Sequence, residues 1–89
     1  MATLTSTPSH HYKRRLEFID PQMVNDLAQQ LIDQRIRLQW TQLQLSKLAG
    51  VQITSINRLE TGDINGVHLD VMLRVVKALG LVINLTPPV

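Results

Sequence analysis

The sequence contains no cysteine, which excludes disulfide bonds, thiolate zinc sites and cysteine nucleophiles. It has only one Trp, one Tyr and one Phe, so we expect an aliphatic core and no stacking platform for single-stranded nucleic acid. Its longest uninterrupted apolar runs have only three residues, as in Leu81-Val82-Ile83, so none spans a bilayer. The N-terminal residues are polar and lack the apolar stretch of a secretory signal. These absences predict a soluble cytoplasmic protein with no membrane partner.

Patterns typical of catalysis and of metal binding are missing as well. The sequence has no evident pair of catalytic carboxylates, no Ser-His-Asp set and no phosphate-cradling glycine loop. The adjacent His10 and His11 have no matched carboxylate or cysteine nearby, and His68 is distant from them in the sequence. These three histidines therefore do not form the pattern of a metal site. A catalytic pocket would also consume much of so small a core. We therefore expect no enzymatic activity, no cofactor and no metal site.

The residues that are present have the composition of one small globular domain. Apolar residues make up 44% of the 89 positions, which is too many for wholesale disorder, and a chain of this length allows a single domain. Nine Lys and Arg against seven Asp and Glu give a net charge of +2, which leans only weakly toward anionic partners. The position of each basic residue therefore says more than the total charge.

Residues 1–19 lack apolar periodicity and are rich in Thr, Ser, Pro and His. We predict a flexible N-terminal arm here, with a short ordered piece around residues 16–19. Within the arm, Lys13-Arg14-Arg15 is compatible with three roles. It binds phosphates, as minor-groove arms do, it is a solvated tail, or it folds against a protein partner. The sequence does not separate these three.

Two helices are predicted in the first half of the remaining chain. Asp20-Pro21 combines an N-cap residue with a proline suited to the first helical position, and apolar residues then recur at helical spacing to about residue 38. Thr41 followed by Gln44 forms a capping box that opens a second helix. Gly50 is placed to end this helix in the left-handed conformation, which leaves a helix too short to be stable without neighbours.

Two further helices follow a tight link at Val51-Gln52. The first spans about Ile53 to Thr61, and the second closes at Gly80. The outward positions of the Ile53–Thr61 helix are small and polar, whereas an ordinary solvated face more often carries Glu and Lys. In the three helices after residue 40, the inward apolar residues we expect are Leu45, Leu48, Ala49, Ile56, Leu59, Leu69, Met72, Leu73, Val76 and Leu79.

The C-terminal segment, residues 82–89, reads as a short β-strand over Val82–Thr86 that prolines then end. A lone strand has no partner in a helical chain, and an uncovered strand edge is a liability. Pairing with the same strand of a second copy across a two-fold axis solves this economically. We therefore assign Val82, Ile83 and Leu85 to dimerisation, with a tail that packs back on the helices as the alternative.

Residues 40–51, WTQLQLSKLAGV, followed by INRLETG at 56–62, resemble the phage-repressor-like helix-turn-helix (XRE) family. The family pattern has Thr-Gln at the start of one helix, Gly-Val at the turn and Ile-x-x-x-Glu-x-Gly at the end of the next. The resemblance extends over about residues 23–81, including the closing VVKALGL. It implies an all-α, compact, four- to five-helix lambda-repressor-like DNA-binding domain over residues 20–81, here with the C-terminal strand. A short domain followed directly by a strand looks most like antitoxins of the HipB type.

The resemblance also implies roles for individual residues. Family positions that contact a phosphate or read bases in the major groove fall on Gln42, Gln52, Ile53, Thr54, Ser55, Asn57, Arg58 and Thr61. Arg pairs with guanine and Asn or Gln with adenine, while Thr and Ile meet a thymine methyl. Ile53 departs from the polar residue common at its position. Arg35 and Glu60 match positions that commonly form an intramolecular ion pair. For each DNA-contacting position, an ordinary solvated or capping role is the alternative.

Three functions are compatible with these observations. The leading one is a homodimeric, sequence-specific repressor that binds a palindromic operator in the cytoplasm, associated with the nucleoid. If the resemblance to HipB holds, it also neutralises a HipA-type kinase toxin and represses its own operon. The alternatives are a helix-turn-helix adaptor that has lost DNA binding, which the low net charge favours slightly, and a DNA-binding subunit of a larger complex. The fold alone does not choose among them.

Overall fold

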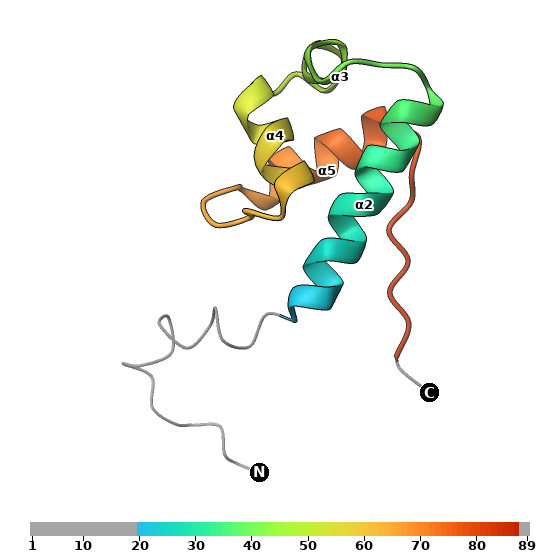
Figure 1. Ribbon diagram of the computed structural model, residues 1–89, viewed down its shortest axis with the longest axis vertical. Coiled ribbons are helices and arrows are strands. Elements are labelled where there is room, and N and C mark those ends of the chain that lie inside the picture. Colours follow the sequence, from blue (N-terminus) through green and yellow to red (C-terminus); the bar gives the residue numbers. More distant parts are fainter. Residues whose placement is uncertain (1–19, 88–89) are drawn as a thin grey trace.

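The computed structural model of the protein describes residues 20–87. Within this range four helices follow one another: α2 (Pro21–Arg37), α3 (Gln42–Ala49), α4 (Ile53–Thr61) and α5 (Leu69–Ala78) (Figure 1). This agrees with the expected all-helical domain. The arm predicted over residues 1–19, including Lys13-Arg14-Arg15, lies outside the described residues, and the division of the chain at residues 19 and 81 stays a prediction. No helix in residues 20–87 is long and apolar enough to cross a membrane.

The helix boundaries follow from local chemistry. The carboxylate of Asp20 accepts a hydrogen bond from the backbone N–H of Gln22 at 2.9 Å, which caps α2. The capping box of α3 is complete: the Gln44 N–H donates to Thr41 Oγ1 at 3.0 Å, and the Thr41 N–H donates to Gln44 Oε1 at 2.7 Å. Gly50 ends α3 in the left-handed region with a φ of 72°. Each of these was predicted from the sequence.

The core is small, aliphatic and shared by all four helices. Helix α4 packs against α2 and α3, and α5 packs against α3. The most deeply buried side chains are Leu31, Leu45, Ile56, Leu59, Val75 and Leu79. Trp40 is half-buried against this cluster. The amide of Gln34 on α2 donates to the carbonyl oxygen of Leu79 at 3.0 Å, which joins the middle of the chain to the end of α5.

Three residues predicted to face inward are exposed instead. Leu48 on α3 is 60% exposed, and Leu69 and Leu73 on α5 are exposed as well. On α3 the buried positions are Leu45 and Ser46, one residue apart. A helix of two turns has room for one narrow buried stripe, and on α3 that stripe runs through Leu45 and Ser46. Leu48 is therefore turned to the edge of that stripe.

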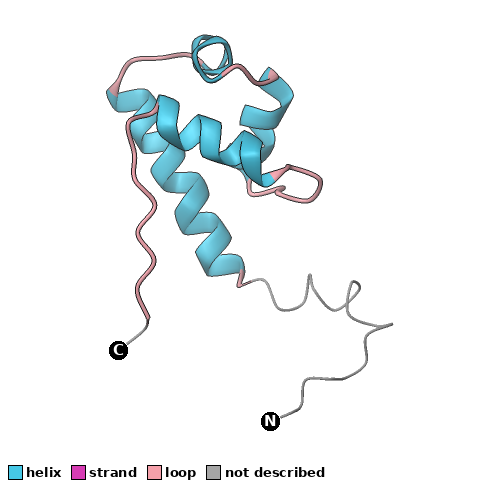
Figure 2. Cartoon of the chain, turned by 180° about the vertical axis from the view of Figure 1, so that it is seen from behind, coloured by secondary structure: helices cyan, strands magenta, loops and turns pink. Residues whose placement is uncertain are grey.

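The predicted C-terminal β-strand is absent from residues 20–87. Residues 81–87 form neither helix nor strand, and they run alongside α2 in both views (Figures 1 and 2). A strand requires hydrogen bonds from a neighbouring strand, and the helical chain provides none. The tail is nonetheless apolar and uncovered, since Val82 is 87% and Leu85 88% exposed. The helix count is four within the described residues, at the lower end of the expected range.

Candidate nucleic-acid interface

Helices α3 and α4 form the compact pair that the sequence predicted. Helix α3 ends at Ala49, the turn occupies residues 50–52, and α4 begins at Ile53. The N–H groups of Gly50 and Val51 both donate to the carbonyl oxygen of Ser46, at 2.9 and 3.0 Å, which closes the turn tightly. Gly50 makes the left-handed turn without strain. Two short helices joined in this way form a helix-turn-helix, whose second helix is suited to the major groove.

An ion pair between helices fixes the orientation of α4. The guanidinium of Arg35 on α2 donates from Nε to Glu60 Oε2 at 2.6 Å and from Nη2 to Glu60 Oε1 at 3.0 Å. Its Nη1 donates to the carbonyl oxygen of Trp40 at 2.8 Å. Gln42, the first residue of α3, donates from Nε2 to Glu60 Oε1 at 2.9 Å. The Glu60 carboxylate on α4 thereby joins α2 to the start of α3, and Arg35 also binds the loop after α2.

Helix α4 has one buried and one exposed face. Ile56 and Leu59 are buried in the core, while the opposite face is open to solvent and, apart from Ile53, polar. The exposed or half-exposed residues of that face and of the preceding cap are Gln52, Ile53, Thr54, Ser55, Asn57, Arg58 and Thr61. The core contacts and the ion pair hold this face outward. The geometry suits insertion of α4 into a groove.

The N-terminus of α4, like that of α5, has no side-chain cap, unlike those of α2 and α3. Both earlier helices are capped by a side-chain oxygen, whereas Gln52 makes no side-chain cap to α4. The first amides of a helix have no partner within the helix, and they carry the positive end of its dipole. An uncapped helix start beside an exposed polar face attracts an anion such as a backbone phosphate.

Comparison with known proteins identifies the family. A helix-turn-helix family model, HTH_3, matches residues 31–82, which is more than half of the chain. The chain belongs to the XRE-type helix-turn-helix family. No curated protein and no solved structure matches it significantly. The match supports a regulator of the DNA-binding type.

Within this helix-turn-helix, the predicted contact residues differ in how available their polar atoms are. One N–H of Gln42 Nε2 is donated to Glu60, which leaves its second N–H and its Oε1 with no partner in residues 20–87. The hydroxyl of Thr61 donates back to the carbonyl oxygen of Asn57 at 2.9 Å, so it is turned toward its own helix. Thr54 Oγ1 lies 3.5 Å from Gln52 Oε1. Asn57 and Arg58, by contrast, have no side-chain hydrogen bond within the described residues.

Arg58 has a neighbour that the sequence did not indicate. Gly66, in the loop between α4 and α5, adopts a φ of 81°, and a Cβ built there would lie 3.5 Å from Nη1 of Arg58. The loop therefore lies directly against the guanidinium. The contact of this loop with Arg58 depends on how α4 and α5 pack, which no local sequence signal indicates. The loop belongs to the helix-turn-helix surface together with α4.

Proposed function

We propose that this protein is a homodimeric, sequence-specific transcriptional repressor of the helix-turn-helix type. The observation that carries the proposal is the polar, outward face of α4, held by the Arg35–Glu60 pair and centred on Asn57 and Arg58. Arg reads guanine bidentately and Asn reads adenine, so these two side chains supply direct readout. The uncapped start of α4 and the second side-chain N–H of Gln42, the one not donated to Glu60, supply positioning contacts to phosphates.

The test is selection of bound duplexes from a random-sequence pool, followed by titration of the selected duplex at several salt concentrations. We expect a palindromic site with half-sites about 34 Å apart or a multiple of this. Binding weakens steeply with salt, because each phosphate contact releases counterions. A pool with no enrichment above non-specific binding contradicts the proposal and favours the adaptor function instead.

Arg58→Ala distinguishes base readout from backbone contact. If Arg58 reads guanine, the variant loses about 1–3 kcal/mol of operator affinity and loses discrimination at one base pair. Asn57→Ala serves as the neighbouring variant, with its loss at a different base pair. An equal loss on all duplexes makes Arg58 a phosphate contact, and no loss on any duplex removes it from the interface.

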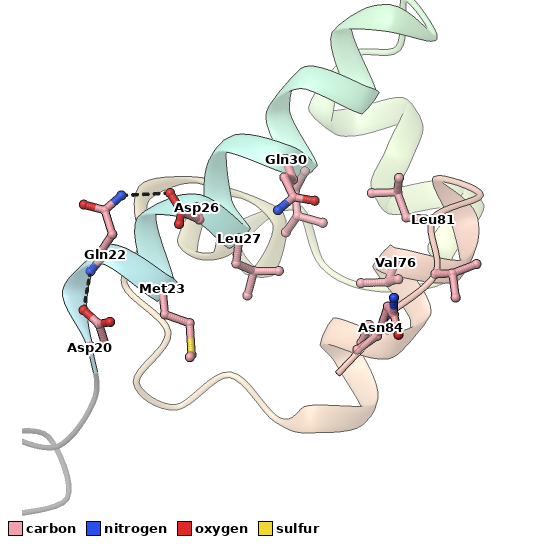
Figure 3. A pocket seen from close by; sticks show the side chains of 12 residues that line it. Asp20, Gln22, Met23, Asp26, Leu27, Gln30, Val76, Leu81 and Asn84 are labelled. Carbon is pink, nitrogen blue, oxygen red and sulfur yellow. Dashed lines mark hydrogen bonds between the residues drawn. The ribbon is translucent and has the colours of Figure 1, made fainter. Parts of the chain in front are cut away.

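Dimerisation is proposed to occur through the C-terminal tail. A groove of about 430 Å³ lies between α2 and the tail, with Met23 and Leu27 on one side and Leu81 on the other (Figure 3). The tail residues Val82, Ile83 and Leu85 extend this apolar surface into solvent. Pairing of two tails across a two-fold axis buries these side chains and supplies the missing strand partner.

Leu85→Asp tests the dimer without disturbing the monomer, because Leu85 is almost fully exposed. We expect the variant to sediment as a folded monomer and to bind a palindrome weakly. Leu69→Asp is the matched control, since it places the same charge on an exposed leucine of α5 away from the tail. An unchanged dimer in Leu85→Asp refutes pairing through the tail.

The finer biological role that we propose is that of an antitoxin in a HipBA-type module. The support is the resemblance of a short helix-turn-helix domain with an apolar tail to HipB-type antitoxins, together with exposed Leu48, Leu69 and Leu73, which a protein partner can cover. Co-expression with a HipA-type kinase encoded in the same operon tests it. Growth rescue, a stable complex and binding of the selected operator upstream of the operon support the role, and absence of all three contradicts it.

A further inference from the structure

A second hollow lies on the flank of the helix-turn-helix, between α3, α4 and α5. It measures about 530 Å³. Its lining comes from the end of α3, the turn, the start of α4 and α5, and consists of Ser46, Lys47, Gly50, Val51, Gln52, Ser55, Val71 and Arg74. Two of these residues are cationic, and none is anionic.

The two cations are available for a ligand. Lys47 on α3 and Arg74 on α5 are both exposed, and within residues 20–87 neither forms an ion pair closer than 4.0 Å. Asp70 precedes Arg74 by one helical turn and is the nearest acidic position along α5, yet it makes no such pair with Arg74. Lys47 and Arg74 are 27 positions apart in the sequence. The packing of α3 on α5 brings them to one hollow.

The hollow is continuous with the candidate nucleic-acid interface. Gln52 and Ser55 line it; Gln52 is the cap residue before α4, and Ser55 belongs to the face of α4 that is proposed to enter the major groove. When a helix lies in the major groove, the sugar–phosphate strands that border the groove pass along the flanks of the helix. We propose that Lys47 and Arg74 each bind a backbone phosphate of the strand beside α4, and this inference rests on the proposed DNA-binding function.

An acidic protein segment is the other anionic ligand that two cations can bind. The lining disfavours it, because Val51 and Val71 are the only apolar side chains larger than a methyl group. Protein interfaces gain most of their affinity from large buried anchors at their centre, and this hollow has no place for one. Hydroxyls and glycine beside two cations suit a phosphate strand better.

The test measures the salt dependence of DNA binding by fluorescence anisotropy. The variants are Lys47→Gln, Arg74→Gln and the double variant, each titrated with the selected operator and with a random duplex. Each phosphate contact contributes about −0.9 to the slope of log K against log salt concentration. We expect each single variant to reduce the slope by about 0.9, and the double variant by about 1.8. Affinity falls by a similar factor on both duplexes, because phosphates carry no sequence information.

Lys77→Gln is the matched control, since it removes the same charge from an exposed residue of α5 that does not line the hollow. We expect its slope of log K against log salt concentration to equal that of the unmodified protein. Asp70→Asn makes the opposite change one turn from Arg74 and strengthens binding to both duplexes. We expect circular dichroism to show that each variant keeps its helices, because the substituted positions are exposed.

The outcomes separate this inference from the proposed function. If the unmodified protein binds no duplex, the proposed function and the inference both fail. If it binds an operator and the double variant keeps the full slope, only the phosphate contacts are refuted. A double variant that binds DNA normally but no longer binds its toxin partner overturns the inference in favour of an acidic protein ligand.

Discussion

The pair of Arg35 and Glu60 offers the sharpest test of how this small domain holds α4 in place. Glu60→Gln keeps the size of the side chain and removes its charge. The carboxylate accepts three hydrogen bonds, two from Arg35 and one from Gln42. The side chains of Arg35 and Glu60 are only 16% and 6% exposed, so water replaces little of what is lost.

The expected loss of unfolding free energy in Glu60→Gln follows from the burial of the ion pair and from the number of hydrogen bonds that it makes. Leaving one partner of a buried ion pair without its counter-charge costs about 3–5 kcal/mol. Arg35 keeps some access to water and a bond to the carbonyl oxygen of Trp40, so we expect the lower end, about 3 kcal/mol. For a domain of this size, that loss lowers the melting temperature by about 12–24 °C.

Urea unfolding followed by circular dichroism and by the fluorescence of Trp40 measures the change. Arg35→Met and Glu60→Leu are each expected to cost about as much as Glu60→Gln, whereas the double variant costs less than their sum by more than 1 kcal/mol, on the order of couplings between contacting residues. Asp33→Asn is the control, because its carboxylate accepts only an exposed bond from Gln29. Single losses that add to within about 0.5 kcal/mol would refute the reasoning.

Three further substitutions test the local signals and the core by thermal unfolding. Thr41→Ala removes one half of the capping box and is expected to cost about 1 kcal/mol, and an unchanged melting temperature contradicts the cap. Gly50→Ala places a Cβ where no atom lies within 4 Å, so its cost of about 1 kcal/mol comes only from the left-handed φ. Leu45→Ala opens a cavity at a fully buried position and costs about 2–5 kcal/mol, whereas a loss below 1 kcal/mol would mean that the site collapses around it.

The sequence predicted those parts of the fold that depend on neighbouring residues. Asp20, the capping box at Thr41 and the glycine after α3 are local signals, and the structure has the helix boundaries where they indicate. Leu48 was assigned wrongly because a two-turn helix has too few residues for its periodicity to define one face. The tail differs for another reason, since a strand is defined by a partner that one chain does not contain.

In the candidate site, too, the local features were predictable from the sequence and the contacts between distant residues were not. The outward residues of α4 follow from the helical period once Ile56 and Leu59 face the core. The contact between Arg35 and Glu60 was expected only from the family resemblance, because 25 positions separate them, and no spacing rule connects such residues. Lys47 with Arg74, and Gly66 with Arg58, were not predicted at all. Their proximity depends on the packing angles of α3, α4 and α5, which the sequence pattern does not encode directly.

The balance of buried and exposed apolar side chains bears on the proposed dimer. Eight apolar residues are buried in the described chain, whereas eleven large ones remain exposed. A surface with so many apolar side chains is typical of protein–protein contact when they lie close together. Val82, Ile83 and Leu85 form one such group on the tail, at the far side of α2 from the bond network that holds α4. The proposed dimerisation there would add apolar burial to a small core and would leave the polar face of α4 free, as two half-sites on one operator require.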